Sequence, residues 1–318
     1  MEKIIRVGLI GVGKMGQNHL RILSMLKGVE IVFIHDANLN TAKKLASMYG
    51  IRSVSDPMEY ATEADAVIIA SPTITHTEYA KLVGEKVKNI FIEKPLSATL
   101  EEAQSLAQFC INNHLHVQIG FIERFNPAVQ ATKKVLNKSG NVISIDFTRT
   151  NKLSGRITDV DVVTDLMIHD IDLAMYMNGS VKNIEAHGIV NEGMIDFASA
   201  LLTHTNGRFS RIQASRITEK KMRSIQVTCN DMFIDCDLLR KEIIISRQSE
   251  IRQIEGEPYT ISAIEESVEV RPQEALLSEL QAFICSCRGE IDKELPGVQS
   301  GLNAMIVCDK IQKAILRR

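Results

Sequence analysis

Short apolar runs and longer amphipathic stretches alternate along the first 120 residues of the chain. Buried parallel strands are near-continuous apolar runs, and the stretches between them have the spacing of surface helices. We expect strands over residues 4–10, 30–34, 65–70, 89–92 and 116–119. We expect helices over residues 17–27, 41–49, 75–85 and 99–112, the last opened by a capping box of Thr99 and Glu102. This order predicts a parallel, doubly wound α/β sheet with right-handed crossovers.

The pattern changes after about residue 140, because long helical crossovers no longer separate the strands. We expect strands over residues 142–149, 196–203, 209–215, 223–229 and 232–237, and helices over residues 162–177, 272–287 and 298–316. Asn206-Gly207 is a strong hairpin signal and Asn230-Asp231 a weaker one. The sequence therefore predicts an α/β domain over residues 1–120. It predicts a second, α+β domain with a large, mostly antiparallel open sheet over residues 121–318, whose C-terminal helix can pack back on the first.

Composition and charge exclude several classes of protein. The chain has 318 residues, is 45% hydrophobic and 24% charged, and carries a net charge of −2. It has no long basic run, so nucleic acid and anionic membranes are poor partners. No apolar stretch reaches the roughly 18 residues of a membrane span. The charged start runs directly into the first strand, so we expect no signal peptide and a cytoplasmic protein. The six cysteines lack metal-ligand spacing, so we expect reduced thiols and no metal site.

A glycine-rich turn joins the first expected strand to the first expected helix. Its residues are Gly11, Val12, Gly13, Lys14, Met15 and Gly16. In this context Gly11 allows the tight turn, Gly13 lets a pyrophosphate approach the backbone, and Gly16 lets the helix lie close to the strand. The N–H groups of the helix N-terminus then bind the phosphates. The motif predicts a dinucleotide site of the Rossmann type, with Lys14 and Met15 in the binding turn.

A carboxylate follows the second expected strand. Asp36 lies about 20 residues after Gly16, where an acid accepts hydrogen bonds from both ribose hydroxyls and repels a 2′-phosphate. Residues 37–40 include no arginine, so we favour NAD over NADP. The alternative is that Asp36 only starts a turn.

Polar residues also follow the later strands of the expected parallel sheet. Ligands on such a sheet lie beyond the carboxyl ends of the strands, so these segments should line one cleft. They begin at Gly11, Asp36, Ser71, Glu93 and Gly120. We therefore expect Ser71, Pro72, His76 and Glu93 to contribute to cofactor binding.

Lys94 stands between Glu93 and Pro95, directly after the fourth expected strand. Pro95 biases Lys94 toward an extended backbone, so the lysine leaves the sheet edge in a defined direction. A lysine in such a cleft can hydrogen-bond a substrate hydroxyl or share its proton with a developing oxyanion. A solvated lysine that happens to precede a proline is the simpler interpretation of this tripeptide taken alone.

Asp165 and His169 lie four residues apart in an apolar stretch that we expect to be helical. This spacing places them on one helix face, where the carboxylate can stabilise the charged form of a general-base histidine. A surface ion pair and a metal site are alternatives, although no third metal ligand stands out. Arg124 and Asn126, in the stretch between the two halves, carry donors suited to a polyhydroxylated or phosphorylated ligand. Hydrogen bonding between the domains is an equal alternative for both.

Taken together, these motifs resemble the glucose–fructose oxidoreductase and inositol 2-dehydrogenase (Gfo/Idh/MocA) family over nearly the whole chain. The resemblance rests on Gly11 to Gly16, Ala70-Ser71-Pro72 leading to His76, Glu93-Lys94-Pro95-Leu96, and Asp165 with His169. It implies an N-terminal Rossmann domain, NAD as cofactor, and a C-terminal open-sheet domain that forms a homodimer or homotetramer. It implies that Lys94 binds the reacting hydroxyl or helps to move its proton. It also implies that His169 is the acid/base, with Asp165 beside it.

Two further segments resemble the branch of this family that contains UDP-N-acetylglucosamine 3-dehydrogenases. They are Ile122-Glu123-Arg124-Phe125-Asn126-Pro127, and Arg156-Ile157-Thr158-Asp159-Val160 leading into His169-Asp170-Ile171-Asp172. This resemblance implies oxidation of the sugar 3-hydroxyl to a ketone by hydride transfer to NAD, in the synthesis of a 2,3-diamino sugar for lipid A. Arg124, Asn126, Lys94, Asp165 and His169 are then the expected substrate-binding residues.

Two alternatives remain open. The chain could be another sugar or inositol dehydrogenase of the same family, or a dinucleotide-binding sensor without catalysis. The presence of Lys94 and His169 argues against the sensor, because a pure binder needs no pair of proton-transfer groups.

Overall fold

A computed structural model of the protein describes residues 3–139, 141–152, 160–252, 260–290 and 292–317. The chain forms two compact units. The first comprises Met1–Ile122 and Glu274–Ile306, and the second comprises Glu123–Gln273 and Val307–Arg318. Residues 156–159, which contribute to the sequence resemblance, lie outside the described part of the chain.

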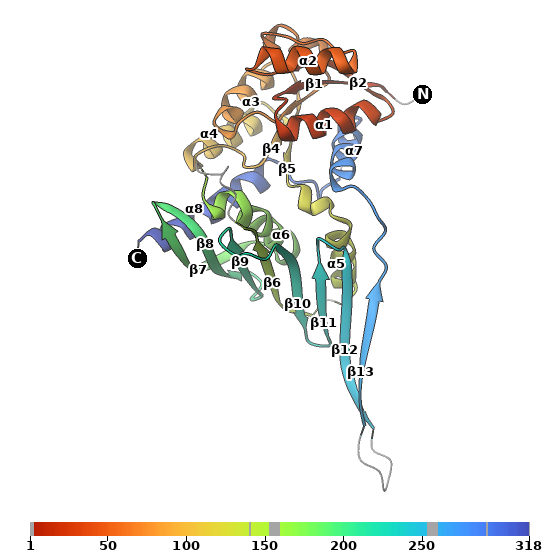
Figure 1. The fold of residues 1–318 in the computed structure, drawn as a ribbon, viewed down its shortest axis with the longest axis vertical. Helices are drawn as coiled ribbons and strands as arrows, with labels where there is room; N and C mark the ends of the chain where they lie inside the picture. The colour runs from red at the N-terminus through yellow and green to blue at the C-terminus, as the bar shows by residue number, and fades with distance from the viewer. Residues whose placement is uncertain (1–2, 140, 153–159, 253–259, 291, 318) are drawn as a thin grey trace. The chain divides into compact units, whose positions relative to one another are not determined.

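The first unit contains a five-stranded parallel sheet in the order β2-β1-β3-β4-β5 (Figure 1). Each pair of neighbouring strands is parallel. The strands are β1 (Ile5–Ile10), β2 (Val29–His35), β3 (Ala66–Ile69), β4 (Asn89–Glu93) and β5 (His116–Gly120). The predicted parallel sheet is therefore confirmed. Its strand order reverses at β1, which has β2 on one side and β3 on the other, and such a point is where α/β sheets bind ligands.

Helices connect these strands, as the alternating pattern predicts. They are α1 (Lys14–Met25), α2 (Leu39–Tyr49), α3 (His76–Gly84) and α4 (Leu100–Asn112). The predicted capping box of Thr99 and Glu102 opens α4. A later helix, α7 (Ala275–Cys287), packs against α1, and its Leu280 and Phe283 belong to the same buried core as the sheet. The first unit is therefore completed by a segment from near the other end of the chain.

The second unit contains an eight-stranded sheet in the order β13-β12-β11-β10-β6-β9-β8-β7 (Figure 1). Its strands are β6 (Val142–Thr150), β7 (Val181–Asn191), β8 (Met194–His204), β9 (Phe209–Ser215), β10 (Met222–Cys229), β11 (Met232–Asp237), β12 (Glu242–Arg252) and β13 (Thr260–Val268). Among the described strand pairs, β6 and β9 run parallel and the others antiparallel. The mostly antiparallel sheet is thus confirmed, and the two expected hairpin turns join β8 to β9 and β10 to β11.

Helices cover one face of this sheet. α5 (Pro127–Ser139) contacts β11 and β12, and α6 (Ile168–Asn178) contacts β6 and β9. Along β6, Ile145 and Phe147 are buried, whereas the alternate residues Ser144 and Asp146 are not. Alternate residues of a strand point to opposite faces, so the apolar set lies on the helix side.

Some elements differ from the expectation. The sequence analysis did not identify β7, β12, β13 or α5. The helix expected over residues 162–177 is present, but it begins as a π-helix over Val163–Met167 before α6 starts. The last helix, α8, spans Val298–Leu316. In the described part of the chain, no helix combines the length and apolar character needed to cross a membrane.

Candidate active site

The three glycines of the turn after β1 differ in their backbone conformation and in the space around them. Gly11 has a φ of +90°, and a Cβ there would lie 2.4 Å from the backbone nitrogen of Ser71. A Cβ on Gly16 would lie 2.0 Å from the carbonyl oxygen of Gly11. A Cβ on Gly13, by contrast, would meet no described atom within 4 Å. The fold itself therefore requires Gly11 and Gly16, whereas Gly13 leaves open space above the turn.

The N-terminus of α1 has the donors that a phosphate group needs. Its N-cap residue is Gly13, which has no side chain to cap the helix, and its first turn holds no acidic residue. The first N–H groups of a helix, here those of Lys14 and Met15, lack partners within the helix. Lys14 is exposed and Met15 is half-buried. This donor set, with the space at Gly13, fits the pyrophosphate of NAD.

Asp36 lies at the end of β2, beside the same turn. Its Oδ2 accepts a hydrogen bond from the backbone N–H of Val12 at 2.8 Å, and its Oδ1 accepts one from Asn38 at 2.8 Å. The side chain is half-buried, and each carboxylate oxygen has a second lone pair. The carboxylate is therefore fixed against the glycine turn and can still accept hydrogen bonds from ribose hydroxyls.

His76, the first residue of α3, joins two of the strand ends. Its Nε2 lies 2.9 Å from the carbonyl oxygen of Ser71, and its Nδ1 lies 2.9 Å from that of Pro95. Burial lowers the pKa of His76, and the two carbonyl groups oppose that change only in part. The ring lies between the two carbonyl groups, and its neutral form donates a hydrogen bond to one of them. His76 thereby lies between the Ser71-Pro72 segment and the Pro95 segment.

Glu93 fixes the backbone of Lys94 at the carboxyl edge of the sheet. Its buried Oε1 lies 2.6 Å from Nε2 of His19 in α1, and its Oε2 accepts a hydrogen bond from the Lys94 N–H at 3.2 Å. Gly120 leaves room for this carboxylate, since a Cβ there would lie 2.8 Å from Oε2. The sequence analysis missed His19, because a single histidine in an apolar helix gives no signal that separates it from an ordinary core residue.

In the second unit, Asp165 lies in the π-helix and His169 in the first turn of α6. The N–H of Ile168 donates to the carbonyl oxygen of Val163, five residues earlier. Asp161 caps this segment by accepting hydrogen bonds from the N–H groups of Val163 at 3.0 Å and Thr164 at 2.9 Å. Short π-helices occur often at functional positions. Asp165 and His169 are both half-buried, so a ligand can reach them.

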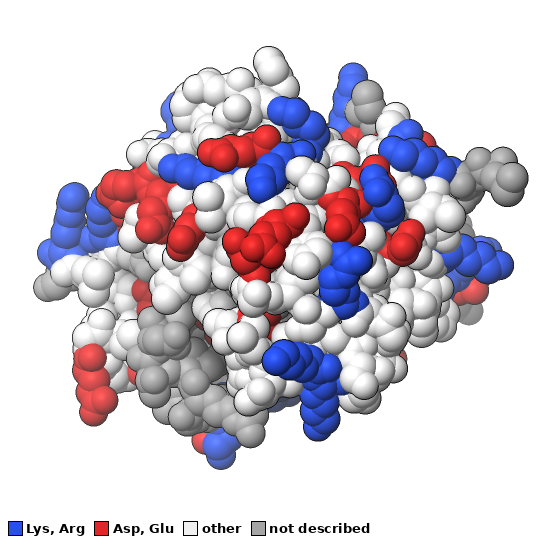
Figure 2. Space-filling view, turned by 90° about the horizontal axis from the view of Figure 1, so that it is seen from above, with Lys and Arg blue, Asp and Glu red and all other residues white. Residues whose placement is uncertain are grey.

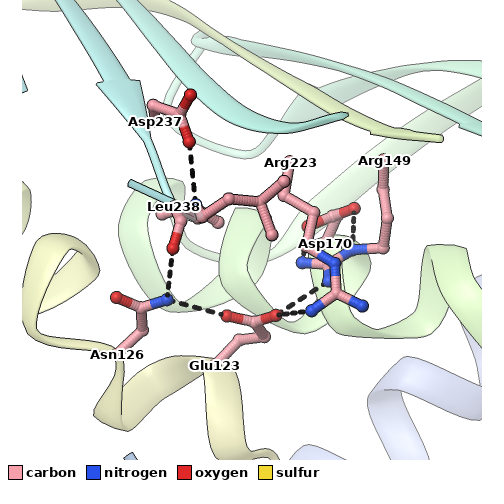
Figure 3. Close-up of polar contacts among 8 residues, drawn as sticks. Glu123, Asn126, Arg149, Asp170, Arg223, Asp237 and Leu238 are labelled. Atoms are coloured by element: carbon pink, nitrogen blue, oxygen red, sulfur yellow. Dashed lines mark hydrogen bonds and ion pairs between the residues drawn. The ribbon is translucent and has the colours of Figure 1, made fainter. Parts of the chain in front are cut away.

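Figure 3 shows a charged network, defined here as Glu123, Arg149, Asp170 and Arg223. Its Asp170 directly follows His169, and all its members except Arg223 are buried. Arg149 donates from Nε and Nη2 to the two oxygens of Asp170 at 2.8 and 2.7 Å, and from Nη1 to Glu123 at 2.8 Å. Burial alone would raise the pKa of Glu123, but the Arg149 charge brings it below its ordinary value. The network therefore ties the residue next to His169 to the central strand β6.

Sequence reasoning missed this network, although one signal was present. Arg149 follows Ile145 and Phe147 at intervals of two residues, so the strand pattern places it on the buried face. A buried arginine needs a carboxylate partner, and Asp170 and Asp172 stand in an otherwise apolar helix.

The structure places Arg124 and Asn126 among partners of the second unit. Arg124 donates from Nε and Nη2 to Asp172 at 2.7 and 2.6 Å and stacks over Tyr176. Asn126 accepts a hydrogen bond from the Ala128 N–H at 3.1 Å, which caps α5, and donates to Glu123 at 3.2 Å. Both side chains are buried, and their predicted contact with substrate stays a prediction.

The metal alternative raised for His169 gains no support from the geometry. Among the described residues, no group of three or more His, Cys, Asp or Glu side chains could hold a metal ion.

Comparison with known proteins agrees with the fold and with NAD as the cofactor. Residues 5–121 match the model described as oxidoreductase family, NAD-binding Rossmann fold, and residues 145–234 match the GFO/IDH/MocA C-terminal domain. A UDP-N-acetylglucosamine 3-dehydrogenase of Acidithiobacillus ferrooxidans is 29% identical over 282 residues, 88% of each chain. A scyllo-inositol 2-dehydrogenase (NAD(+)) of Bacillus subtilis is 31% identical over 239 residues, 68% of each chain.

Solved structures show the same architecture. The UDP-N-acetylglucosamine 3-dehydrogenase from Acidithiobacillus ferrooxidans matches with a TM-score of 0.88 and 25% identity, over 98% of this chain and 97% of that chain. Levoglucosan dehydrogenase in complex with NADH matches with a TM-score of 0.83 over 98% and 97% of the two chains, and its 21% identity shows the fold alone. The present chain belongs to the Gfo/Idh/MocA family of oxidoreductases, and its first unit is an NAD-binding Rossmann domain.

Proposed function

We propose that the protein oxidises a sugar ring hydroxyl to a ketone with NAD, and that its substrate is UDP-N-acetylglucosamine, oxidised at the 3-hydroxyl. The observation that carries the dehydrogenase function is the fixed position of Lys94. Glu93 holds the Lys94 backbone at the carboxyl edge of the sheet that bears the glycine turn, and pairs with His19 of α1. The choice of substrate is supported by the 29% identity to the UDP-N-acetylglucosamine 3-dehydrogenase over 88% of the chain.

In this proposal the chain supplies proton transfer and orientation. NAD, when bound, supplies the acceptor for the hydride that leaves the ring carbon. His169 accepts the hydroxyl proton, and Asp165 orients the imidazole and stabilises its charged form. Lys94 donates a hydrogen bond to the hydroxyl oxygen as negative charge develops there. The proposal requires both side chains to act on the same hydroxyl, which holds the sugar ready to react.

A small-molecule substrate also suits the charge of the protein. The net charge is −2, and acidic and basic side chains are interspersed on the face shown in Figure 2. Nucleic-acid binding depends on a broad basic surface, which this face does not present.

One specific observation favours a second candidate, an inositol dehydrogenase. The scyllo-inositol 2-dehydrogenase has 31% identity to this chain, although over a shorter stretch than the nucleotide-sugar enzyme. The two candidates need the same chemistry at one hydroxyl, and they differ only in what surrounds that hydroxyl.

An absorbance assay for NADH formation separates these functions. The purified protein and NAD are mixed with UDP-N-acetylglucosamine, myo-inositol, glucose or buffer. NADH from the nucleotide sugar alone is the expected result. NADH from myo-inositol would support the second candidate, and tight NAD binding without turnover on any substrate would favour a sensor.

The role of His169 has its own test. Replacing His169 with Ala removes the proton acceptor, so turnover should fall by roughly 10²–10⁴-fold, as for other lost acid/base groups. NAD affinity, measured by titration calorimetry, should not change, because the glycine turn and Asp36 are intact. Turnover equal to that of the unmodified enzyme would refute the assignment.

A further inference from the structure

Arg149 and Arg223 lie directly opposite each other on neighbouring strands of the second sheet. The register of β6 and β10 pairs the two residues, so both side chains point to the face that α6 covers. Like charges in this arrangement repel unless acceptors compensate each of them. The two arginines can therefore be compared by the acceptors that each one has.

Among the described residues, two carboxylates compensate the positive charge of Arg149, whereas the charge of Arg223 is compensated only in part. The Arg149 side chain is 2% exposed and makes three short hydrogen bonds to Asp170 and Glu123. The Arg223 side chain is 34% exposed, and its Nη1 lies 3.5 Å from the Glu123 oxygen that Arg149 already binds. Among the described residues this is the one acceptor of the Arg223 guanidinium. No described residue accepts a hydrogen bond from its Nε or Nη2, so these donors can bind another group.

The charges around Arg223 also leave its positive charge only partly compensated, in agreement with its few hydrogen bonds. Burial lowers the pKa of Arg223, and the Arg149 charge lowers it further. Glu123, Asp170 and Asp165 offset this only in part. Arg149 occupies both oxygens of Asp170, and Glu123 is shared between the two arginines. Within the described part of the chain, Arg223 is thus a partly exposed cation that shares its one carboxylate with Arg149.

We propose that Arg223 binds an oxyanion group of the sugar substrate and makes the enzyme prefer phosphorylated sugars to neutral ones. An oxyanion would provide the missing charged partner, and a guanidinium binds phosphate in a two-pronged geometry. Arg223 lies opposite Arg149, which binds Asp170 directly after His169, so a ligand held there lies near the proposed acid/base residue. This inference rests on the proposed function and assigns a residue to the charged group of its substrate. The phosphate can belong to a nucleotide diphosphate or to a sugar monophosphate.

Binding experiments test the inference without turnover. UDP and glucose 6-phosphate are titrated by calorimetry into the NAD-loaded protein, as the unmodified chain and as the Arg223→Gln, Arg223→Lys and Arg211→Gln variants. Arg211 is the matched control, because it pairs with Asp146 on the opposite face of the same sheet. Arg223→Gln should weaken binding of at least one of the two probes by about 10- to 100-fold, as for a lost hydrogen bond to a charged group. Arg223→Lys should recover part of the loss, and Arg211→Gln should have no effect.

Steady-state kinetics supply the second readout. Arg223→Gln should raise KM for the phosphorylated substrate while KM for NAD stays the same. The inference is overturned if the unmodified protein binds neither probe, if Arg223→Gln binds both with unchanged affinity, or if KM for the phosphorylated substrate does not change. If no sugar is oxidised but UDP or glucose 6-phosphate binds through Arg223, the proposed function fails and the oxyanion site stands. Equal melting temperatures of the Arg223→Gln and Arg211→Gln variants would show that the effect does not come from unfolding.

Discussion

The three glycines of the turn, Gly11, Gly13 and Gly16, differ in the atoms that a side chain at each position would meet. Gly11 and Gly16 avoid backbone atoms of the protein, and Gly13 faces open space. The motif predicted this division, because it assigns Gly13 to the approach of a pyrophosphate and the other two glycines to the turn and to helix packing. It did not indicate which backbone atoms crowd Gly11 and Gly16.

Alanine substitutions should separate folding from cofactor binding. Gly11→Ala forces a Cβ against the Ser71 backbone at a φ of +90°, so we expect a loss of more than about 2 kcal/mol in the free energy of unfolding. Gly13→Ala should cost less than about 1 kcal/mol, the usual effect at an N-cap, yet weaken NAD binding by at least about tenfold. Urea unfolding and calorimetric NAD titration measure the two quantities. A Gly13→Ala protein with full NAD affinity would contradict the proposed path of the pyrophosphate.

His76 makes stability depend on pH. Burial puts the pKa of His76 below its ordinary value of 6.5, so the folded state binds this proton less tightly than the unfolded state. Stability is therefore fully present above about pH 6.5 and is lost as the pH falls toward the lowered pKa. His116 and His204 are shifted in the same direction, also by burial.

The free energy of unfolding should accordingly be smaller at about pH 5.5 than at about pH 7.5. In His76→Gln, which cannot titrate, the difference between the two pH values should shrink without vanishing, since His116 and His204 still contribute. Urea unfolding at both pH values gives the comparison. An identical pH difference in the variant would show that His76 does not contribute.

The start of α6 shows how an element is held in place for chemistry. Its neighbour π-helix carries Asp165, its first turn carries His169, and Asp170 is bound to Arg149 on β6. A buried ion pair of this kind adds little net stability, but removing one partner leaves a buried charge uncompensated. The network therefore restricts where α6 can lie on the sheet.

Replacing Arg149 tests that restriction. Arg149→Met should lower the free energy of unfolding by about 3–5 kcal/mol, because Asp170 and Glu123 lose their partner. Adding Asp170→Leu to the same chain should recover part of the loss, since the buried charge is then gone. Arg240→Met, which removes an exposed ion pair with Asp237, should cost less than about 1 kcal/mol. If Arg149→Met unfolds at the same urea concentration as the unmodified protein, the network does not hold α6.

Elements with strong hydrophobic periodicity could be predicted, and those without it could not. The parallel strands are mostly apolar, and β9 and β11 alternate between buried and more exposed residues, so their positions follow from the sequence. β7 exposes most of its side chains at the edge of the sheet, and β12 and β13 are rich in polar residues, so their pattern resembles that of loops. The π-helix could not be predicted, because apolar spacing does not distinguish hydrogen bonds to the fourth residue from those to the fifth.

The sequence also predicted only part of the candidate site, namely the residues that belong to motifs with a recognisable pattern. Residues carried by motifs, such as Gly13, Asp36 and Lys94, have fixed spacing along the chain. His19, Arg149 and Arg223 depend on partners that are distant in sequence, and only the fold brings those partners together. Arg149 could have been suspected from its strand position, but its partner could not have been chosen between Asp170 and Asp172.

On the scale of the whole molecule, the second sheet presents a face that no described helix of its own unit covers (Figure 1). Leu201, Phe209, Phe233 and Ile244 are partly exposed along it. Leu201 and Phe209 line a shallow hollow with Ser144, Asp146 and Arg211. Contiguous apolar side chains of this kind mark interaction surfaces, and we predict that a second copy of the chain covers them.

Sedimentation or light scattering tests this prediction of a homodimer or homotetramer. A chain carrying both Leu201→Glu and Phe209→Glu should shift toward the monomer mass of 35.4 kDa, because charges would be buried at the contact. Met48→Glu is the control, since Met48 is 69% exposed on α2 of the first unit and should leave the mass unchanged. A monomeric unmodified protein, or an oligomer that survives the double substitution, would contradict the prediction.

The contribution of α7 to the first unit has a consequence for synthesis of the protein. Leu280 and Phe283 lie in the same core as residues of β1 and α1, yet they are translated after nearly the whole second unit. As the nascent chain emerges from the ribosome, the apolar side chains that α7 later covers stay open to water until that helix arrives. Such a delay favours chaperone association with the growing polypeptide, and the nucleotide site gains its full support only when translation is almost complete.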